Sequence, residues 1–371
     1  MHDLWLLVEP ADVWLFRDAR PFTAGESAFA ASQFPPRPAT LAGAFRTLIG
    51  QRLFAGSYAR LGDADASPIR FRGPLLCRRD HGRWAVTVPV PADLLTPEDE
   101  PNQSAVYAEP RPLPSWVRRW PPSERPVFWT DRPGVLETAS GWMTLEGFRF
   151  WQRRQLIDSQ VFGKSPHVIE PRPGIRLDSP RGVVRPEGGA FYFVHYVRLQ
   201  EDSALLVGLE RGTWPSEDWD RLCRLWDDGC EMPMRLGGER RLAFVRKAPP
   251  EVVDGLKGAL NVPTPAVTCH TVVLLTPAVL DDTHTYKVHL RDGSSIPFSI
   301  QALAVQRGAI VHVGWDYVRN APKPPRRLLS AGSVLVLETS QPVSLDGWCA
   351  VGDLHTLGYG WAVPAHRPPS P

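Results

Sequence analysis

The chain opens with two short apolar runs and then changes to a helical spacing of apolar residues. Leu4–Val8 and Val13–Phe16 predict strands, and a loop over 17–37 follows them. From Thr40, the predicted N-cap, apolar residues recur at i, i+3, i+4, i+7 and i+8, which predicts an amphipathic helix. The residues of this stripe are Leu41, Ala44, Phe45, Leu48 and Ile49.

The other side of this helix carries the small residues Gly43, Thr47 and Gly50, with Arg46 beside them. Glycine inside a helix costs about 1 kcal/mol relative to alanine, so a close neighbour is expected to compensate. Either a packed loop or an RNA backbone satisfies this pattern, and the sequence leaves both open.

The middle of the chain alternates between patterned and irregular segments. Residues 70–95 predict a hairpin that turns at Asp80–Gly82. Residues 97–140 are Pro-rich and predict a long irregular insertion, and 141–186 are basic and rich in loops. We therefore expect 70–186 to be largely inserted into the first domain.

Patterned segments resume after this insertion. Ala190–Leu199 and Ala204–Glu210 predict a strand pair, and Leu242–Val245 predicts another strand. Between them, Ser216 is the predicted N-cap of a second helix, because Glu217 and Asp218 stand in the first turn, where the helix dipole favours acids. The apolar stripe of this helix is Trp219, Leu222, Cys223 and Trp226.

A shorter version of the same order follows after a Pro-bounded segment. Strands are predicted at Cys269–Leu275, Ala309–Trp315, Ser333–Leu337 and Tyr359–Val363, with a short helix at Ile300–Val305. Strand–helix–strand–strand–helix–strand is the ferredoxin-like order. We predict an α+β fold with two ferredoxin-like, RRM-like domains in tandem and large loop insertions in the first. Its parts are 1–250 with the insertion 70–186, a linker over 251–265, and 266–371.

Composition excludes several classes of protein. With 371 residues, 43% hydrophobic and 22% charged, the chain is ordinary globular protein of about two domains. Five scattered Cys form no CxxC pair, so neither a zinc site nor a disulfide framework is predicted. The N-terminus is not a signal peptide, and no apolar run reaches the length of a membrane span. We expect a cytoplasmic protein with no metal, no cofactor and no membrane contact.

The net charge of +2 hides a strong segregation of charge. Residues 17–79 carry a local charge of +6 and 141–186 one of +4, whereas 199–232 carry −6. Five of the 42 basic residues are Lys, so the other 37 are Arg, a bias that codon usage or phosphate recognition explains. Two basic segments that also bear aromatic residues favour nucleic-acid binding. The acidic helix and the Pro-rich insertion are candidates for protein contacts.

Four segments resemble one known family. They are Phe16–Gly43, the Leu-Gly-Gly-Glu-Arg-Arg run at 236–241, the block from Gly314 to Ser333, and Gly358–Gly360. Together they resemble the third subunit of the Cmr (type III-B CRISPR) effector complex, a member of the RAMP superfamily. The resemblance spans the chain from about Phe16 to Gly360. The insertion 97–140 matches no part of that pattern.

The resemblance implies a non-catalytic RNA-binding subunit in antiviral defence. Such a subunit holds the 5′ repeat-derived tag of the CRISPR RNA (crRNA), docks on the large polymerase-like subunit and on a backbone RAMP subunit, and meets target RNA indirectly. Arginine can fork onto phosphates, and phenylalanine can stack on splayed bases. The candidate RNA-binding residues are Arg17, Arg20, Phe22, Thr23, Gly25, Phe34, Arg37, Thr40, Gly43, Arg46, Lys164, His167, Arg176, Arg240, Arg241, Lys323, Arg326, Arg327, Gly358, Tyr359 and Gly360.

The alternative is a RAMP-type endoribonuclease that processes CRISPR RNA with a His general base. His167 is the best candidate for this role, because it lies in a basic loop with Lys164 and Arg176 nearby in sequence. No nucleophile triad, Walker loop or metal-ligand cluster is evident in the sequence. We therefore predict no catalytic residues and keep the ribonuclease as the competing hypothesis.

Overall fold

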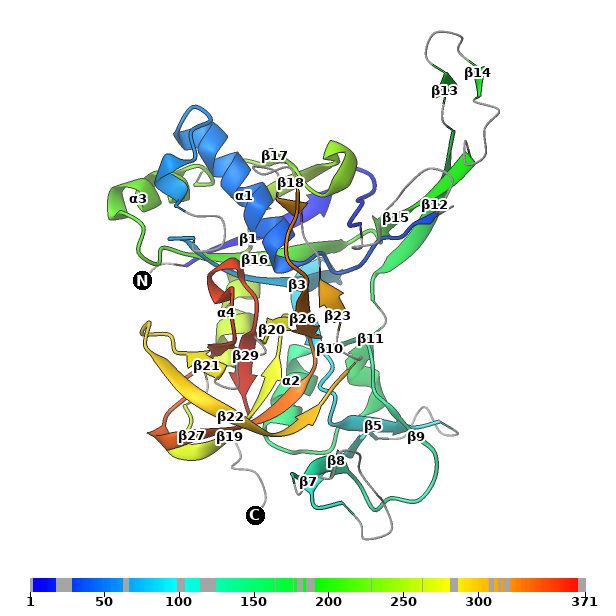
Figure 1. The fold of residues 1–371 in the computed structure, drawn as a ribbon, viewed down its shortest axis with the longest axis vertical. Helices are drawn as coiled ribbons and strands as arrows, with labels where there is room; N and C mark the ends of the chain where they lie inside the picture. The colour runs from blue at the N-terminus through cyan, green and yellow to red at the C-terminus, as the bar shows by residue number, and fades with distance from the viewer. Residues whose placement is uncertain are drawn as a thin grey trace.

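The computed structural model describes residues 3–17, 29–62, 67–98, 104–113, 125–163, 165–175, 177–178, 183–184, 191–227, 229–261, 263–280, 286–306, 310–312, 315–316 and 321–365. Strands dominate this part of the chain, and its four α-helices all lie before residue 261. Figure 1 shows three regions: an N-terminal sheet with helices, a C-terminal barrel below it, and a long hairpin that projects away from both.

An eight-stranded antiparallel sheet forms the N-terminal part. Its strands, in spatial order, are β11 (Phe162–Gly163), β10 (Trp142–Thr144), β4 (Arg83–Pro89), β3 (Arg70–Asp80), β16 (Ser203–Glu210), β1 (Leu4–Pro10), β18 (Leu242–Lys247) and β17 (Met232–Arg235). Helix α1 (Pro38–Leu53) connects β1 to β3, and α3 (Ser216–Arg224) lies between β16 and β18. The predicted ferredoxin-like element order is therefore present in this half.

Both predicted helix caps are wrong. The N-cap of α1 is Arg37, because Pro38 starts the helix at the first position, where its missing N–H is not needed. Thr40 lies inside the first turn. The N-cap of α3 is Pro215, and Ser216 is already helical and makes no capping hydrogen bond.

The segment 70–186 contributes to the main sheet rather than lying outside it. The predicted hairpin is confirmed as β3 and β4, and His81 and Gly82 between them both have positive φ, as a tight two-residue turn requires. Helix α2 (Leu145–Gln152) was not predicted; the Thr144 hydroxyl accepts a hydrogen bond from the Gly147 amide and caps it. The short strands between them are β5 (Leu94–Pro97), β6 (Val106–Tyr107), β7 (Glu109–Arg111), β8 (Val127–Trp129) and β9 (Leu136–Thr138).

The projecting hairpin, which we call the arm, consists of β12 (His167–Ile175) and β15 (Phe191–Leu199), with β13 (Leu177–Asp178) and β14 (Val183–Val184) near its tip (Figure 1). The predicted pairing of 190–199 with 204–210 is wrong, although both strands exist. β15 pairs with β12, whereas β16 pairs with β1 on one edge and with β3 on the other. Val13–Phe16 forms only an isolated bridge, from Trp14 to Val197.

The C-terminal part is a closed six-stranded barrel. Its order is β19 (Val267–Leu274), β27 (Val334–Val343), β22 (Ser295–Ala304), β21 (Tyr286–His289), β28 (Cys349–Val351) and β29 (Trp361–Pro364). The remaining strands of this part are β20 (Ala278–Val279), β23 (Ile310–His312), β24 (Trp315–Asp316), β25 (Ala321–Pro322) and β26 (Arg326–Leu329).

The second half of the tandem prediction is not confirmed. All of the short helix predicted at Ile300–Val305 except Val305 belongs to strand β22, and between 263 and 365 the described residues contain no α-helix. The predicted linker contains helix α4 (Pro250–Leu260), whose residues Val252 and Leu256 are buried. A barrel without helices on one face is not ferredoxin-like, so the tandem arrangement is not found.

The two halves share their hydrophobic cores. Leu328, Leu357 and Tyr359 from the C-terminal part pack into the same cluster as α1 and the main sheet. Trp361 lies 6.0 Å from Trp5, ring centroid to ring centroid, in a second shared cluster. A third cluster is confined to the barrel.

Candidate RNA-binding surface

The described ends of the first loop are tied together. Arg17 forms a β-bridge with Ser32, the Gln33 amide donates to the Phe16 carbonyl at 2.8 Å, and the Phe16 amide donates to the Ser32 hydroxyl at 3.2 Å. The two described ends of the loop therefore lie next to each other, beside the base of the arm. The candidates Arg20, Phe22, Thr23 and Gly25 lie outside the described residues, as do Lys164 and Arg176.

Two basic segments far apart in sequence meet at this point. β2 (Phe29–Ala30), on the returning side of the loop, pairs in parallel with β15 of the arm. The ring of Phe34 lies 4.5 Å from the ring of His167, centroid to centroid, at an angle of 36°. Phe34 is half-buried and also packs against the main core. The Phe34 ring therefore packs against the main core, and it also contacts the arm through His167.

The Gly-Gly-Glu-Arg segment, Gly237–Arg240, contacts the residues just before the first loop. Gly238 donates its amide to the Leu15 carbonyl at 2.7 Å, and Gly237 has φ of 79°. A Cβ added at Gly237 would lie 2.5 Å from the carbonyl oxygen of Leu15, so a larger residue would push the start of the loop away. Glu239 and Arg240 also have positive φ. The close approach of two backbones accounts for the two glycines.

Tyr196 of β15 connects the Gly-Gly-Glu-Arg segment to the arm. Its hydroxyl donates to the Glu239 carboxylate at 2.6 Å, and the Arg241 guanidinium lies 4.5 Å from the ring centroid. Arg241 also donates to Glu239 at 2.9 Å. Burial and the adjacent carboxylate raise the pKa of Tyr196. Tyr196 was not among the candidates, since a tyrosine in a strand carries no sequence signal of this role.

A four-residue ion-pair network stiffens the base of the arm. Arg172 donates to Asp12 at 3.0 Å and to Glu170 at 2.7 Å, and Arg198 donates to Asp12 at 2.9 Å and also to Glu170. These arginines hold the pKa of both carboxyl groups below the usual range. Their charge is compensated within the protein, so they add little positive potential for RNA.

The remaining arginines of the region differ in their exposure and in their hydrogen bonds. Arg46 donates to the carbonyls of Leu61 and Gly62 at 2.5 and 2.8 Å. Arg37 donates to the Gln33 side chain at 2.7 Å. The side chains of Arg17 and Arg240 are exposed, and the two residues lie on either side of the Leu15–Gly238 contact.

The small-residue stripe on α1 resolves into two environments. A Cβ added at Gly50 would lie 2.8 Å from the ring of Tyr58, so this glycine admits a packed loop. Gly43 is exposed, and no atom lies within 4 Å of the corresponding position among the described residues. The packed-loop interpretation is therefore the right one for Gly50, whereas Gly43 leaves an open patch.

The C-terminal candidates lie elsewhere. Lys323 and Arg327 are on or beside β26, and Arg326 approaches Asp353 at 3.9 Å. Gly358, Tyr359 and Gly360 are buried. The Gly358 carbonyl accepts from the Thr276 hydroxyl at 2.7 Å, and a Cβ there would lie 3.0 Å from the Gly73 carbonyl. These three residues close the contact between the barrel and the main sheet, which is a packing role.

His167 is partly buried and lies beside Ser165. Its Nδ1 is 2.7 Å from the Ser165 hydroxyl, and partial burial lowers its pKa. At neutral pH the ring is therefore uncharged. No group of three or more His, Cys, Asp or Glu in the described ranges could hold a metal ion, and no helix there is long and apolar enough to cross a membrane.

Comparison with known families decides the assignment. Residues 6–364 match the family described as CRISPR-associated protein (Cas_Cmr3). The chain belongs to this family. The resemblance to the third subunit of the Cmr complex is thereby confirmed, and the Cmr3 family places the chain in a type III-B CRISPR effector complex. None of the curated proteins matches the sequence.

One solved structure shares the fold at low sequence identity, and two others were matched with lower TM-scores. One chain in the cryo-EM structure of the type III-B Cmr-beta complex bound to cognate target RNA and AMPPnP has a TM-score of 0.50 and 13% identity, over 90% of this chain and 86% of that one. A Cmr-beta structure bound to cognate target RNA gives 0.49 and 12% over the same shares. The Csm3–Csm4 subcomplex of type III-A gives 0.41 and 9%, over 98% and 100%.

Proposed function

We propose that this Cmr3-family chain is a non-catalytic subunit that holds the 5′ tag of the crRNA where the first loop meets the arm. The observation that carries the proposal is the convergence of the two basic, aromatic-bearing segments, through the β2–β15 pairing and the Phe34–His167 contact. Separated basic patches would attract RNA without orienting it, whereas patches joined on a rigid base can fix the path of a strand.

Exposure selects the arginines that we propose contact the RNA. Arg172, Arg198 and Arg241 are tied to carboxylates, and Arg46 to backbone carbonyls. Arg17 and Arg240 are exposed on the described rim of the loop. Because an exposed guanidinium is accessible to a phosphate and can form a bidentate contact with it, these two carry the proposal.

The docking partners proposed are the large polymerase-like subunit and a backbone RAMP subunit, with target RNA met only through the complex. Helix α3 fits a protein contact only in part. Its Asp218 is buried and paired with Arg60 and Arg221 at 3.1 and 3.4 Å, while Glu217 and Asp220 stay exposed. The exposed acids are therefore the portion of α3 available to a partner.

Substitution of the two exposed arginines tests RNA binding. If Arg17 and Arg240 each neutralise one phosphate, Arg17→Gln and Arg240→Gln should each flatten the log–log salt dependence of affinity by roughly 0.7. The measurement is binding of labelled crRNA, with and without its 5′ tag, across a salt series. The loss should be larger for the tagged RNA.

Arg52→Gln is the matched control. Arg52 is an exposed arginine on the same helix that follows the loop, but it stands about 21 Å along α1 from Pro38. It should leave both affinity and slope unchanged. If Arg17→Gln and Arg240→Gln bind like Arg52→Gln at every salt concentration, this surface does not hold the RNA.

The second candidate is the endoribonuclease, favoured by one observation: His167 is uncharged at neutral pH and its Nδ1 is oriented by Ser165. A neutral, oriented imidazole is competent as a general base. Incubation of the purified protein with labelled repeat RNA separates the hypotheses. Cleavage that His167→Ala abolishes and His81→Ala preserves would replace our proposal with the ribonuclease.

A further inference from the structure

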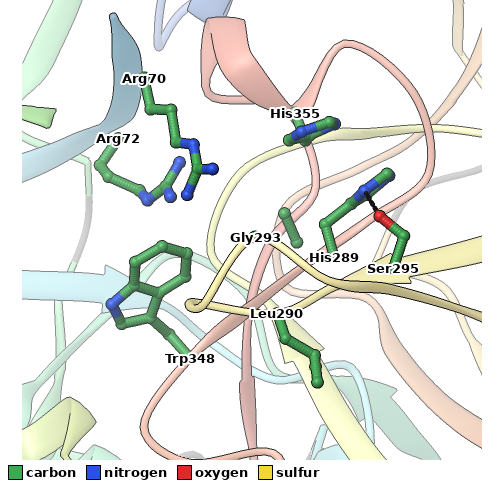
Figure 2. A pocket seen from close by; sticks show the side chains of 9 residues that line it. Arg70, Arg72, His289, Leu290, Gly293, Ser295, Trp348 and His355 are labelled. Atoms are coloured by element: carbon green, nitrogen blue, oxygen red, sulfur yellow. Dashed lines mark hydrogen bonds between the residues drawn. The ribbon is translucent and has the colours of Figure 1, made fainter. Parts of the chain in front are cut away.

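A cavity of about 230 Å³ lies where β3 of the main sheet faces the C-terminal barrel (Figure 2). It is separate from the loop and the arm. Two of its residues, Arg70 and Arg72, stand at alternate positions of β3 and so share one face of the strand. The groups opposite and beside them are His289, Ser295, Trp348 and His355.

Arg72 is fully buried but incompletely bonded. Its Nη1 donates to the Phe71 carbonyl and its Nη2 to the Glu210 carboxylate, both at 2.9 Å. The guanidinium lies 3.8 Å from the ring centroid of Trp348. Its Nε has no hydrogen-bond partner among the described residues. The positive charge of Arg72 is therefore held in the wall of the cavity by Glu210 and Trp348.

Arg70 adds a second positive charge to the same wall. Figure 2 shows the Arg70 and Arg72 guanidinium groups side by side. Glu210 forms an ion pair with Arg72, and within the described ranges Arg70 makes no hydrogen bond or ion pair. Burial lowers the pKa of Arg72 to about 10, which still leaves it protonated at neutral pH. Arg291 and Asp3 are also close enough to act on the charge of Arg72, so three arginines outnumber the two carboxylates of Glu210 and Asp3 and leave the region positive.

The opposite wall offers one neutral N–H donor, on His355. His289 is held between the Ser295 hydroxyl at 2.7 Å and the Gly352 carbonyl at 3.1 Å, and it stacks on His355 at 3.7 Å between ring centroids. Burial, His289 and the two arginines lower the pKa of His355 to about 4. Its ring is therefore uncharged at neutral pH and keeps one N–H to donate.

We propose that this cavity binds a phosphate group, carried either by inorganic phosphate or by the terminal phosphate of a nucleotide. The planar guanidinium of Arg70 matches phosphate oxygens, and the buried charge of Arg72 beside it adds attraction for an anion. An anion between the guanidinium groups also removes their mutual repulsion. The base of a nucleotide would remain outside, because Arg72 already covers the Trp348 ring.

Calorimetric titration of the full-length protein tests the proposal with three probes: inorganic phosphate, adenosine 5′-monophosphate and adenosine. Both phosphate-bearing probes should bind and adenosine should not. Tighter binding of the monophosphate than of inorganic phosphate identifies a nucleotide as the source, and equal binding identifies free phosphate. Absence of binding by both phosphate probes overturns the proposal.

Variants locate the site. Arg70→Gln should weaken phosphate binding about tenfold because it removes a positive charge, and His355→Phe should do so because it removes an N–H donor while keeping an aromatic ring. Arg79→Gln is the control, because Arg79 is an exposed arginine at the other end of β3. Arg72 is not substituted, because a change at this buried side chain would also lower the stability of the fold. Equal phosphate affinity in all three variants overturns the assignment. If Arg17→Gln loses RNA binding but keeps phosphate binding, the two proposals are tested separately.

Discussion

A single buried carboxyl, Asp93, shows how strongly environment overrides residue type in this protein. Its Oδ1 accepts a hydrogen bond from the Trp151 indole at 2.8 Å, and Arg154 lies at 4.0 Å. Burial nevertheless dominates and raises the pKa of Asp93 from 3.8 to about 6. The folded state therefore holds the proton more tightly than the unfolded chain does.

The stability contributed by this group is present at acidic pH and is lost as pH rises from about 4 to about 6. A shift of that size corresponds to about 3 kcal/mol. Asp93→Asn keeps the acceptor for Trp151 but cannot ionise. We expect the unfolding free energy of the variant, relative to wild type, to rise by about 3 kcal/mol between pH 4 and 7, as measured by urea unfolding.

A pH-independent difference between Asp93→Asn and wild type would contradict this prediction, because it would mean that Asp93 is ionised in the folded protein at no cost.

The arginines show what sequence could not reveal at the scale of residues. Charge counting correctly marks 17–79 and 141–186 as basic, but it treats every arginine alike. In the fold, Arg72 is buried against Trp348 and Arg198 is bound to two carboxylates, while Arg240 is exposed. The partner of each arginine lies up to 186 residues away, so no local pattern separates these cases.

Helix α4 is the element whose nature departs most from the prediction. The dipeptide Pro249-Pro250 and the later Pro263 and Pro265 favour a linker, but proline is also well suited to the first position of a helix. Val252, Leu256, Ala259 and Leu260 are buried in the second shared core. The spacing of these four residues was the overlooked helical signal.

A packed helix and a linker respond differently to truncation. Leu256→Ala should lower the unfolding free energy by about 2–5 kcal/mol, because Leu256 is completely buried. Lys257→Ala, at the adjacent exposed position, should change it by less than about 0.5 kcal/mol. Urea unfolding of the two variants measures both values. Equal small effects would restore the linker interpretation.

Strand β22 shows the opposite error, a strand mistaken for a helix. Gln301, Ala302 and Leu303 have good helix propensity, which favours the predicted short helix. In the barrel, Ala302 and Ala304 are buried and Leu303 between them is exposed, the alternation of a strand. Pairing with β27 and β21 decides the conformation, and such pairing is a long-range property.

At the scale of the whole molecule, local patterns predicted the first half far better than the second. The helix α1, the hairpin β3–β4 and the order of elements around the main sheet follow from periodicity and turn residues. Closure of the barrel through the β19–β29 pairing joins residues about 90 positions apart and has no local signature. The meeting of Phe34 with His167 is of the same kind.

Shared cores imply that the two halves unfold together, although one core cluster belongs to the barrel alone. Leu335 is completely buried in that cluster, so Leu335→Ala should remove about 2–5 kcal/mol. If the molecule is one cooperative unit, hydrogen exchange of the most protected amides in β1 and β16 should accelerate as much as in β22 and β27. Leu303→Ala is the control, because Leu303 pairs with Leu335 but is exposed. Acceleration confined to the barrel strands would instead reveal two independent domains, as the tandem prediction requires.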